Sequence, residues 1–385
     1  MKAMSRREFV KSTSTAAAAT TFGVFPNPFS DQGVTYDKLP RWKGFNLLDF
    51  FTSNPKPSYP RLKTEEVHLK WMADWGFNFI RLPMAYPYFL RFDRSEPITT
   101  DRMEKFHRKR VREMDQIIEW ADKYGIHVSL NLHRAPGFCI NSGFVEPYNL
   151  WYSEQALDDF CAQWAFWAKR YRRYSPSQIS FDLLNEPCLR EDMNDQYSER
   201  KAVPGPVYRN LIMRASRAIK NENPKALIIA DGNNIGADVI TEATDLEVAQ
   251  SCRGYTPHII SHYKAEWAFK DFSQLPQPEW PITHQNTVYD RVFLEQCYEP
   301  WIALTRQGIG VHCGECGCYK ETPHDVFLAW FGDVLSIFKE NQIGFALWNF
   351  IGDFGILDSR RKDVTYKTWN GHQLDEKLLK LLADL

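Results

Sequence analysis

The sequence predicts a single (β/α)8 barrel, an α/β fold in which eight parallel strands alternate with helices. Eight apolar segments of strand length are each followed by a longer segment that carries a helical pattern or leads into one. Several of the strand-like segments end in a polar side chain, as barrel strands do at the edge that carries the chemistry. No linker, internal repeat or low-complexity segment divides the chain. We therefore expect one domain over residues 31–385.

The expected strands are short apolar runs that are bounded by glycine, proline or polar residues. They cover residues 41–48, 77–83, 126–133, 179–185, 226–232, 259–263, 310–315 and 343–349. Apolar residues at helical spacing predict the helices. These cover residues 64–75, with Thr64 as the N-cap, and residues 101–124, 154–174, 207–222, 290–307, 323–341 and 375–385. The polar residues 191–206 are expected to form a loop over the mouth of the barrel.

A doubly wound open sheet is the competing arrangement for alternating strands and helices. Such sheets usually bind a dinucleotide at a glycine-rich turn after the first strand. Here Gly44 stands alone in the first strand. The closed barrel is therefore the favoured fold.

The first 30 residues predict an export signal rather than a part of the fold. Residues 5–11, Ser-Arg-Arg-Glu-Phe-Val-Lys, match the twin-arginine pattern. The weakly apolar residues 12–25 that follow are too few to cross a bilayer. We expect the mature chain to begin between residues 26 and 31 and to be periplasmic or extracellular, with no membrane segment.

Charge and composition exclude some classes of partner. The 47 basic side chains are balanced by 48 acidic ones, so no uncompensated basic stripe for nucleic acid is expected. Aromatic residues make up 15% of the chain, including 13 Trp. They indicate either a large aromatic core or a cleft in which indole rings stack on sugars, and composition alone does not separate the two.

The cysteines do not predict a disulfide scaffold, because eight of them are spread over a long chain. Cys313, Cys316 and Cys318 lie close enough in sequence to suggest a zinc site. A structural zinc needs four ligands, and no second Cys or His pair has a matching spacing. Small side chains that pack around a barrel strand are the better interpretation.

The clearest functional signal is residues 179–187, Ile-Ser-Phe-Asp-Leu-Leu-Asn-Glu-Pro. Strand interiors avoid Asn, Glu and Pro, so the strand ends here with polar side chains. Asp182 shares the alternating face of Glu186, which points it into the barrel, where it needs a partner. Similar polar or aromatic ends occur on other strands. Together the strand ends supply Arg81, His133, Asn185, Glu186, His262, Glu315 and Trp348.

Two of these residues, Glu186 and Glu315, would face each other across the barrel mouth from strands four and seven. Paired carboxylates can cleave a glycosidic bond, because one protonates the leaving oxygen while the other attacks the anomeric carbon. A separation of about 5 Å predicts retention of configuration, and about 6.5–9.5 Å predicts inversion. Acid and nucleophile suffice, so no cofactor and no metal is implied.

These motifs resemble glycoside hydrolase family 5, the cellulase family of retaining (β/α)8 enzymes. Asn185-Glu186-Pro187 is similar to its acid/base signature, and Gly314-Glu315 to its nucleophile. Arg81, His133, His262 and Trp348 occur in the family's order along the chain. The residues 354–359 with Arg361 and Asp363 are also similar to single-domain members. The resemblance covers nearly the whole chain after the export segment.

The resemblance implies a role for each residue. Glu186 would be general acid and then general base, and Glu315 would be the nucleophile. Arg81 would hold Glu315 in its ionised form, and Asn185 would bind the sugar 2-hydroxyl. The two histidines would bind hydroxyls or orient the glutamates. Trp348 would form the floor of the subsite at which the bond is cleaved.

Two positions depart from the family pattern. The family often has an aromatic residue two places after the histidine of strand six, and its hydroxyl contacts the nucleophile. Here that position holds Lys264, and Tyr263 follows His262 directly. Either Tyr263 takes over the contact through a shifted strand end, or Lys264 changes how the site is connected. The phenylalanine that commonly follows the nucleophile is Cys316 here. Both departures bear on the substrate more than on the reaction.

The sequence therefore predicts a retaining, endo-acting hydrolase of β-linked oligo- or polysaccharides, active as a monomer. An exo-β-glucosidase or exo-glucanase, or a β-mannanase with the same machinery, is the alternative. The loops after strands three, four and six would decide whether the cleft is closed at one end. A non-catalytic glycan-binding barrel is disfavoured, because it would not need to keep Glu186, Glu315 and Arg81.

Overall fold

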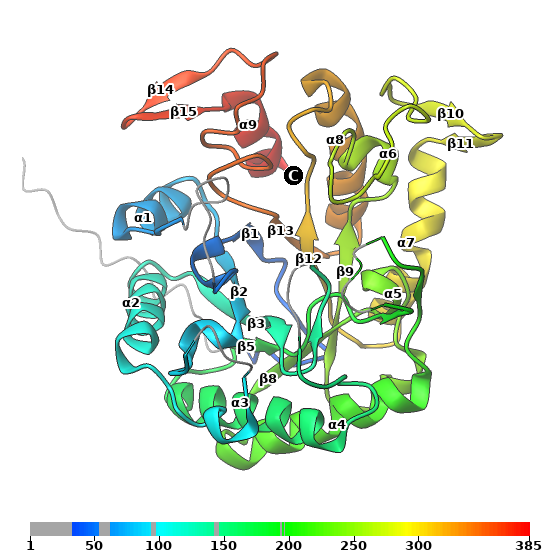
Figure 1. Ribbon diagram of the computed structural model, residues 1–385. Helices are drawn as coiled ribbons and strands as arrows, with labels where there is room; N and C mark the ends of the chain where they lie inside the picture. Colours follow the sequence, from blue (N-terminus) through cyan, green and yellow to red (C-terminus); the bar gives the residue numbers. More distant parts are fainter. Residues whose placement is uncertain (1–32, 54–61, 94–97, 142–145, 193–194, 196) are drawn as a thin grey trace, which may run out of the picture.

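Eight parallel strands close into a barrel in the computed structural model (Figure 1). The structure describes residues 33–53, 62–93, 98–141, 146–192, 195 and 197–385. Each barrel strand pairs with the next one along the chain, and the last pairs with the first. The strands are β1 (Lys43–Asn46), β2 (Phe79–Ala85), β3 (His127–Ala135), β5 (Ile179–Asp182), β8 (Leu227–Asp231), β9 (Ala249–Gly254), β12 (Val311–Cys316) and β13 (Gly344–Leu347). The predicted fold is confirmed.

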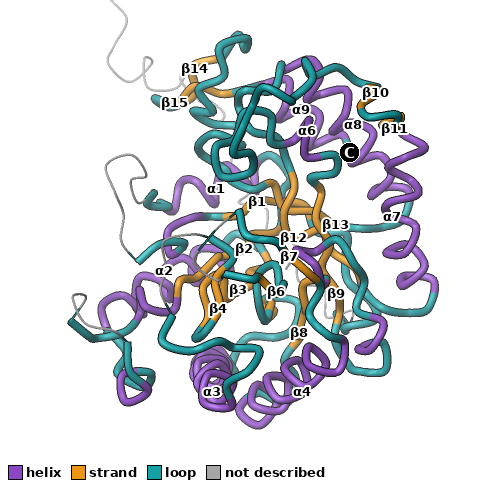
Figure 2. The backbone as a smooth tube through the Cα atoms, turned by 45° about the vertical axis from the view of Figure 1, so that its right-hand side comes forward, coloured by secondary structure: helices purple, strands orange, loops and turns teal. Residues whose placement is uncertain are grey.

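Helices surround the barrel as an outer layer (Figure 2). The longer ones are amphipathic and turn their apolar side chains toward the strands. They are α1 (Glu66–Asp74), α2 (Arg108–Lys123), α3 (Glu154–Tyr171), α4 (Gly205–Glu222), α7 (Arg291–Arg306), α8 (His324–Glu340) and α9 (Glu376–Asp384). Two single turns, α5 (Asn233–Gly236) and α6 (His258–Ser261), follow β8 and β9.

The loops contain short antiparallel pairs of strands. β4 (Phe138–Cys139) folds back on the end of β3. The remaining pairs are β6 (Leu189–Arg190) with β7 (Arg200–Lys201), β10 (Ile282–His284) with β11 (Thr287–Tyr289), and β14 (Lys367–Trp369) with β15 (His372–Leu374). The predicted loop at 191–206 thus contains the second strand of a small hairpin and the start of α4.

The predicted sixth strand at residues 259–263 is wrong. The strand lies earlier, at β9, and residues 259–261 form part of α6. β9 was missed because its buried positions include the polar residues Gln250, Ser251 and Arg253, which interrupt the apolar pattern. Ile259 and Ile260 are more apolar, but they belong to the single turn after Pro257.

Two helices begin later than the sequence predicts. The expected helix at 101–124 begins only at Arg108, after a short 3-10 turn at Thr100–Arg102. Thr64 does not cap α1, because its hydroxyl donates to Asp49 Oδ2 at 2.6 Å. Glu65 caps the helix instead, in a reciprocal arrangement with His68.

The core accounts for much of the aromatic content. Trp164, Trp167, Trp301 and Trp330 are almost completely buried between the helices and the barrel. Cys313, Cys316 and Cys318 are buried in and beside β12, where their thiols donate to backbone carbonyls. The cysteine cluster packs within the barrel wall, as expected.

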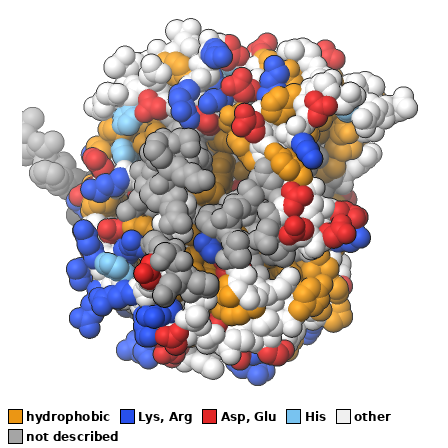
Figure 3. All heavy atoms as spheres, in the orientation of Figure 1, with side chains coloured by type: hydrophobic (Ala, Val, Ile, Leu, Met, Phe, Trp, Pro, Cys, Tyr) orange, Lys and Arg blue, Asp and Glu red, His pale blue; other side chains and the backbone are white. Residues whose placement is uncertain are grey.

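Charged side chains of both signs are spread over the face seen in Figure 3, in keeping with the balanced composition. Within the described residues, no helix has the length and apolar character needed to span a bilayer. The predicted export signal, residues 1–30, lies outside the described part of the chain.

The lower end of the barrel, where its strands begin, contains two buried histidines in an aromatic stack. The His127 ring lies 3.8 Å from the Trp42 ring, and the His312 ring lies 4.4 Å from that of Phe79. His127 bonds Ser180 Oγ and the Ser177 carbonyl, both at 2.9 Å. Neither ring nitrogen of His312 has a hydrogen-bond partner among the described residues. Burial lowers the pKa of each histidine to about 3.

These histidines should make the fold sensitive to acid. In unfolded chains their pKa is about 6.5, so the unfolded state binds more protons between about pH 3 and 6.5. Their contribution to stability is complete above pH 6.5 and is lost as the pH falls. In His312→Leu, the free energy of unfolding relative to the natural protein should rise by about 2 kcal/mol between pH 7.5 and 5.

Urea unfolding of both proteins at the two pH values measures this difference. His284→Leu, on the exposed β10–β11 hairpin, is the matched control and should show no comparable change. Parallel pH dependence of the natural protein and His312→Leu would contradict the prediction.

Candidate active site

The C-terminal end of β5 carries the residues singled out in the sequence. Glu186 lies just beyond the strand and has a positive φ of 49°, which is unfavourable for a residue that precedes proline. Its backbone N–H donates to Asp231 Oδ2 at 3.0 Å. The buried Asp231 at the end of β8 therefore holds the strained backbone that aims Glu186.

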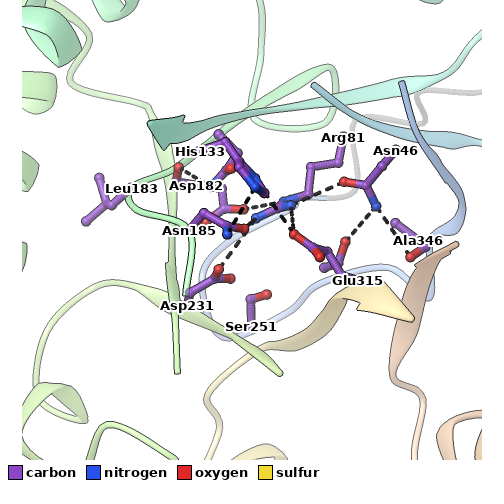
Figure 4. Close-up of polar contacts among 12 residues, drawn as sticks. Asn46, Arg81, His133, Asp182, Leu183, Asn185, Asp231, Ser251, Glu315 and Ala346 are labelled. Carbon is purple, nitrogen blue, oxygen red and sulfur yellow. Dashed lines mark hydrogen bonds and ion pairs between the residues drawn. The ribbon is translucent and has the colours of Figure 1, made fainter. Parts of the chain in front are cut away.

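Arg81, on β2, is the centre of a buried polar network (Figure 4). Its Nε donates to Asp182 Oδ2 and its Nη1 to Glu315 Oε1, each at 2.7 Å. Nη1 also reaches Asn46 Oδ1 at 3.2 Å, and Nη2 reaches Asn185 Oδ1 at 2.9 Å. The expected pairing of Arg81 with Glu315 and the inward orientation of Asp182 are both present.

A second guanidinium, from Arg253 at the end of β9, completes the network. Its Nε donates to Glu186 Oε1 at 3.1 Å and its Nη2 to Asn185 Oδ1 at 3.0 Å. Arg253 also forms a two-pronged ion pair with Asp231, with Nη1 3.0 Å from Oδ1. Nη2 lies 3.6 Å from Glu315 Oε1. Both candidate glutamates thus contact one guanidinium.

The two arginines fix the orientation of the Asn185 amide. An amide oxygen and nitrogen are assigned from their partners, and Oδ1 accepts from both Arg81 and Arg253. The Nδ2 group must therefore face the other way, where it lies 3.5 Å from His133 Nε2. Asn185 is therefore oriented to donate from Nδ2 toward His133.

The buried carboxylates differ in proton affinity. Burial and the neighbouring Glu315 raise the pKa of Glu186 to about 7, although Arg253 opposes this shift. Burial and Asp231 raise the pKa of Asp182 to about 7 against the effect of Arg81. For Asp231, burial acts upward, but Arg253 and Arg81 outweigh it and lower its pKa. A carboxyl with a pKa near 7 can act as an acid or a base at neutral pH.

Tyr255, one residue beyond β9, supplies the hydroxyl that contacts Glu315, with a distance of 3.2 Å to Oε2. The sequence prediction gave this contact to Tyr263 because strand six was misplaced. Tyr263 is buried after α6, and the Lys264 ammonium lies 5.0 Å from its ring centre. The residue two places before Tyr255 is Arg253, where a histidine was expected.

The remaining predicted residues line the same region. The His133 ring stacks on the Trp348 ring at 5.5 Å, and its Nδ1 lies 4.0 Å from Glu315 Oε1. Burial, with Arg81 and Arg253, holds the His133 pKa well below its ordinary value, so this ring is neutral. His262 follows α6 and packs edge-on to Tyr255 at 4.9 Å. It is thus linked to the site through Tyr255 rather than through a strand end.

Four residues of this network were not selected from the sequence. Asn46 and Asp231 end strands one and five, and the rule that selects polar strand ends would have found them. Asn46 donates to the Gly314 carbonyl at 3.0 Å, beside Glu315. Arg253 and Tyr255 were missed because their strand was assigned to residues 259–263.

The arrangement brings two carboxyl groups with different partners together in one mouth. Glu315 accepts from Arg81 and Tyr255, which suits a group that works as an anion. Glu186 has a pKa near 7 and a side chain that is 15% exposed, so it can exchange a proton with a bound molecule. This separation of roles is what hydrolysis of a glycosidic bond requires.

Known proteins are similar to this chain in sequence and in fold. A solved structure described as a glycoside hydrolase is 34% identical, has a TM-score of 0.79, and aligns over 89% of this chain and 99% of its own. Endoglucanase C of Acetivibrio thermocellus is 23% identical over 79% of this chain and 89% of its own length. Cel5A of Thermotoga maritima, solved with cellobiose, shares the fold with a TM-score of 0.69 at 19% identity, over 91% of this chain and 100% of its own.

The family model described as Cellulase (glycosyl hydrolase family 5) matches residues 34–353, which include every barrel strand. The chain therefore belongs to glycosyl hydrolase family 5, a family of enzymes that hydrolyse O-glycosyl bonds with retention of configuration.

Proposed function

We propose that this protein is a retaining, endo-acting β-glycan hydrolase that resembles endo-β-glucanases. The observation that carries the proposal is that Glu186 and Glu315 both contact the guanidinium of Arg253, and that the pKa of Glu186 is raised to about 7. The endoglucanases among its relatives support a β-glucan as the substrate. The paired glutamates argue against a barrel that only binds glycans.

In the first step, protonated Glu186 gives its proton to the glycosidic oxygen as the bond from that oxygen to the anomeric carbon breaks. A carboxylate oxygen of Glu315 bonds to the same carbon and forms a glycosyl ester. In the second step, ionised Glu186 takes a proton from water. The water oxygen bonds to the anomeric carbon and releases Glu315. The donor Nδ2 of Asn185 is oriented toward the sugar 2-hydroxyl.

Aromatic side chains beside these glutamates suit sugar rings. Trp348 stands at the end of β13 against His133 and Phe51. Farther out, Trp267 is 44% exposed and packs edge-on against Tyr319 at 4.8 Å. Phe354 joins this group and lies 6.3 Å from the Tyr255 ring. We infer that Trp267 offers its indole face to a glucosyl unit beyond the cleaved bond.

An exo-acting glucanase or glucosidase is the second candidate, with a β-mannanase as a variant of either mode. Two contacts favour partial closure of the cleft. Arg190, in the loop after β5, donates to the Ile140 carbonyl in the loop after β3. Tyr197, farther along the β5 loop, donates to the Glu266 carbonyl in the loop after β9. Glucan 1,3-β-glucosidases also occur among the relatives.

We further propose that the chain is exported through its twin-arginine motif and works as a monomer outside the cytoplasm. Large polysaccharides do not cross the cell membrane, so a hydrolase that acts on them must meet them outside. Size-exclusion chromatography of the mature chain should give a mass close to that of one copy.

Analysis of the products from several polysaccharides tests the substrate and the mode of attack. We expect rapid loss of viscosity with few new reducing ends on soluble cellulose derivatives or mixed-linkage glucan. Proton NMR of fresh products should show the β-anomer first. β-1,3-Glucan, xyloglucan and mannan serve as comparison substrates. Release of one terminal sugar at constant viscosity would favour the exo-acting alternative.

Replacement of either glutamate should abolish hydrolysis of polysaccharides. Glu315→Ala removes the nucleophile and Glu186→Ala the proton donor, which alone contributes about 10²–10⁴-fold. Azide should restore turnover of a dinitrophenyl β-cellobioside by Glu186→Ala, because this leaving group needs no acid and azide needs no base. Glu119→Gln, on the exposed face of α2, is the control. Undiminished hydrolysis by both alanine variants would refute the assignment.

Trp267→Ala should weaken binding without slowing the chemistry. Loss of one aromatic contact of about 0.5–1.5 kcal/mol corresponds to a two- to tenfold rise in KM for cellohexaose. The kcat value should stay within about twofold, because the ring contacts of Trp267 are with His262, Tyr319 and Phe354. Tyr152→Ala, which also removes an exposed aromatic ring, is the matched control. An unchanged KM for the longer substrate would rule out this subsite.

A further inference from the structure

Arg253 occupies a position from which it can act on both glutamates. It pairs with Glu315 in the register of β9 with β12, next to an irregularity between Cys313 and Glu315. Its side chain is only 6% exposed. Beneath it, the Tyr298 hydroxyl donates to the Arg253 carbonyl at 3.2 Å. Tyr298 thus helps to fix the backbone that carries Arg253.

The fold leaves space for this long side chain at two glycines. A Cβ on Gly236, which has a φ of +75°, would lie 2.6 Å from Arg253 Cγ. A Cβ on Gly314 would lie 3.2 Å from Arg253 Nη1. A larger residue at either position would displace the guanidinium. The turn after β8 and the residue before Glu315 therefore both accommodate Arg253.

Every nitrogen of the Arg253 guanidinium has a partner. Nε faces Glu186, and Nη2 faces Asn185 and Asp231. Nη1 donates to Asp231 Oδ1, to Ser251 Oγ at 3.2 Å and to the Cys252 carbonyl at 3.1 Å. Because all sides are held, the direction of Nε is fixed, and with it the preferred position of the Glu186 carboxylate.

We propose that Arg253 is the positioning residue of Glu186 and orients its carboxyl group, as Arg81 orients that of Glu315. The inference rests on the proposed roles of the two glutamates. Arg81 contacts Asp182 and Glu315, and Arg253 contacts Asp231 and Glu186. These are the shorter ion pairs, and longer ones of 3.5 Å and 3.6 Å join Arg81 to Asp231 and Arg253 to Glu315.

Arg253 opposes three influences that favour the proton on Glu186, which are burial, Glu315 and Asp231. Burial and Glu315 raise the Glu186 pKa, whereas the Arg253 charge lowers it. Without this charge, Glu186 would keep its proton at higher pH and would be a poorer base for the second step. With it, the carboxyl can give a proton in one half of the reaction and take one in the other.

The test compares pH profiles of kcat/KM for Arg253→Gln, Arg253→Lys and the natural enzyme. The basic limb of the natural enzyme should lie near pH 7, because Glu186 must be protonated to act as an acid. In Arg253→Gln the limb should move to higher pH by about one unit or more, since a cation at this distance has that effect. Arg253→Lys keeps the charge, so its limb should stay close to that of the natural enzyme. Its kcat should nevertheless fall, because lysine cannot reach both Glu186 and Asn185.

A second readout separates positioning from a general loss of structure. For Arg253→Gln, kcat/KM on cellotetraose should fall at least tenfold more than kcat/KM on dinitrophenyl β-cellobioside, whose leaving group needs no proton. Arg253→Gln/Asp231→Asn removes both charges and guards against misfolding caused by an unpaired Asp231. Asp231 acts in the opposite direction on Glu186, so the limb of the double variant should move upward less than that of the single variant.

An unmoved basic limb in folded Arg253→Gln, or equal losses on the two substrates, would overturn the inference. Glu186→Gln separates this result from failure of the proposed function. If Glu186→Gln is inactive on cellotetraose while the Arg253 variants keep the natural profile, only the role of Arg253 is wrong. If Glu186→Gln remains fully active, the role of Glu186 itself is wrong, and the inference about Arg253 falls with it.

Discussion

The burial of two guanidinium groups among four carboxyl groups is the constraint on which the barrel mouth depends. Arg81 and Arg253 come from β2 and β9, and their partners end β5, β8 and β12. These ion pairs join five of the eight strands, and Asn46, which accepts from Arg81, adds β1 as a sixth. Charges at such depth are tolerated only when hydrogen bonds satisfy them, and removing one partner from a buried pair costs about 3–5 kcal/mol. The site and the upper part of the barrel stabilise each other.

The same constraint separates the two glutamates chemically. Four carboxyl groups facing two guanidiniums would carry two excess negative charges if all were ionised. The raised pKa values of Asp182 and Glu186 relieve this excess, because both groups can hold protons near pH 7. Asp231 is kept ionised by its two arginines, after burial alone would have had the opposite effect. Protonation of Glu186 is thus a property of the whole cluster.

Much of the fold could be predicted from the sequence, because seven of the eight strands combine apolar runs with clear stops. The exception, β9, carries Gln250, Ser251 and Arg253 at buried positions. A prediction from the local sequence pattern assigns such polar residues to the solvent-exposed surface. Their buried hydrogen-bond partners come from other strands and are known only once the barrel is assembled. The same polar residues that build the site therefore concealed its strand, and Arg253 and Tyr255 were hidden with it.

The candidate glutamates were predictable for the opposite reason. Asn185, Glu186 and Pro187 follow an apolar run so abruptly that the sequence indicates a strand end with its polar groups in the mouth. Beyond the pair of Arg81 with Glu315, the sequence could not supply the pairing of the charges. That Arg81 contacts Asp182 as well as Glu315 depends on strand register, and one residue of slip would turn each side chain to the other face. The anchoring role of Asp231 follows from the same register.

The two ends of the barrel respond to pH in opposite directions. At the mouth, Asp182 and Glu186 have folded pKa values near 7, above the values of about 4 in unfolded chains. The folded state binds more protons there, so this contribution to stability declines as the pH rises from about 4 to 7. At the lower end, His127 and His312 are held neutral, and their contribution grows over nearly the same interval. The opposing slopes partly cancel, so the pH dependence of the intact protein understates how strongly each layer is coupled to protons. Only substitution within one layer at a time exposes that coupling.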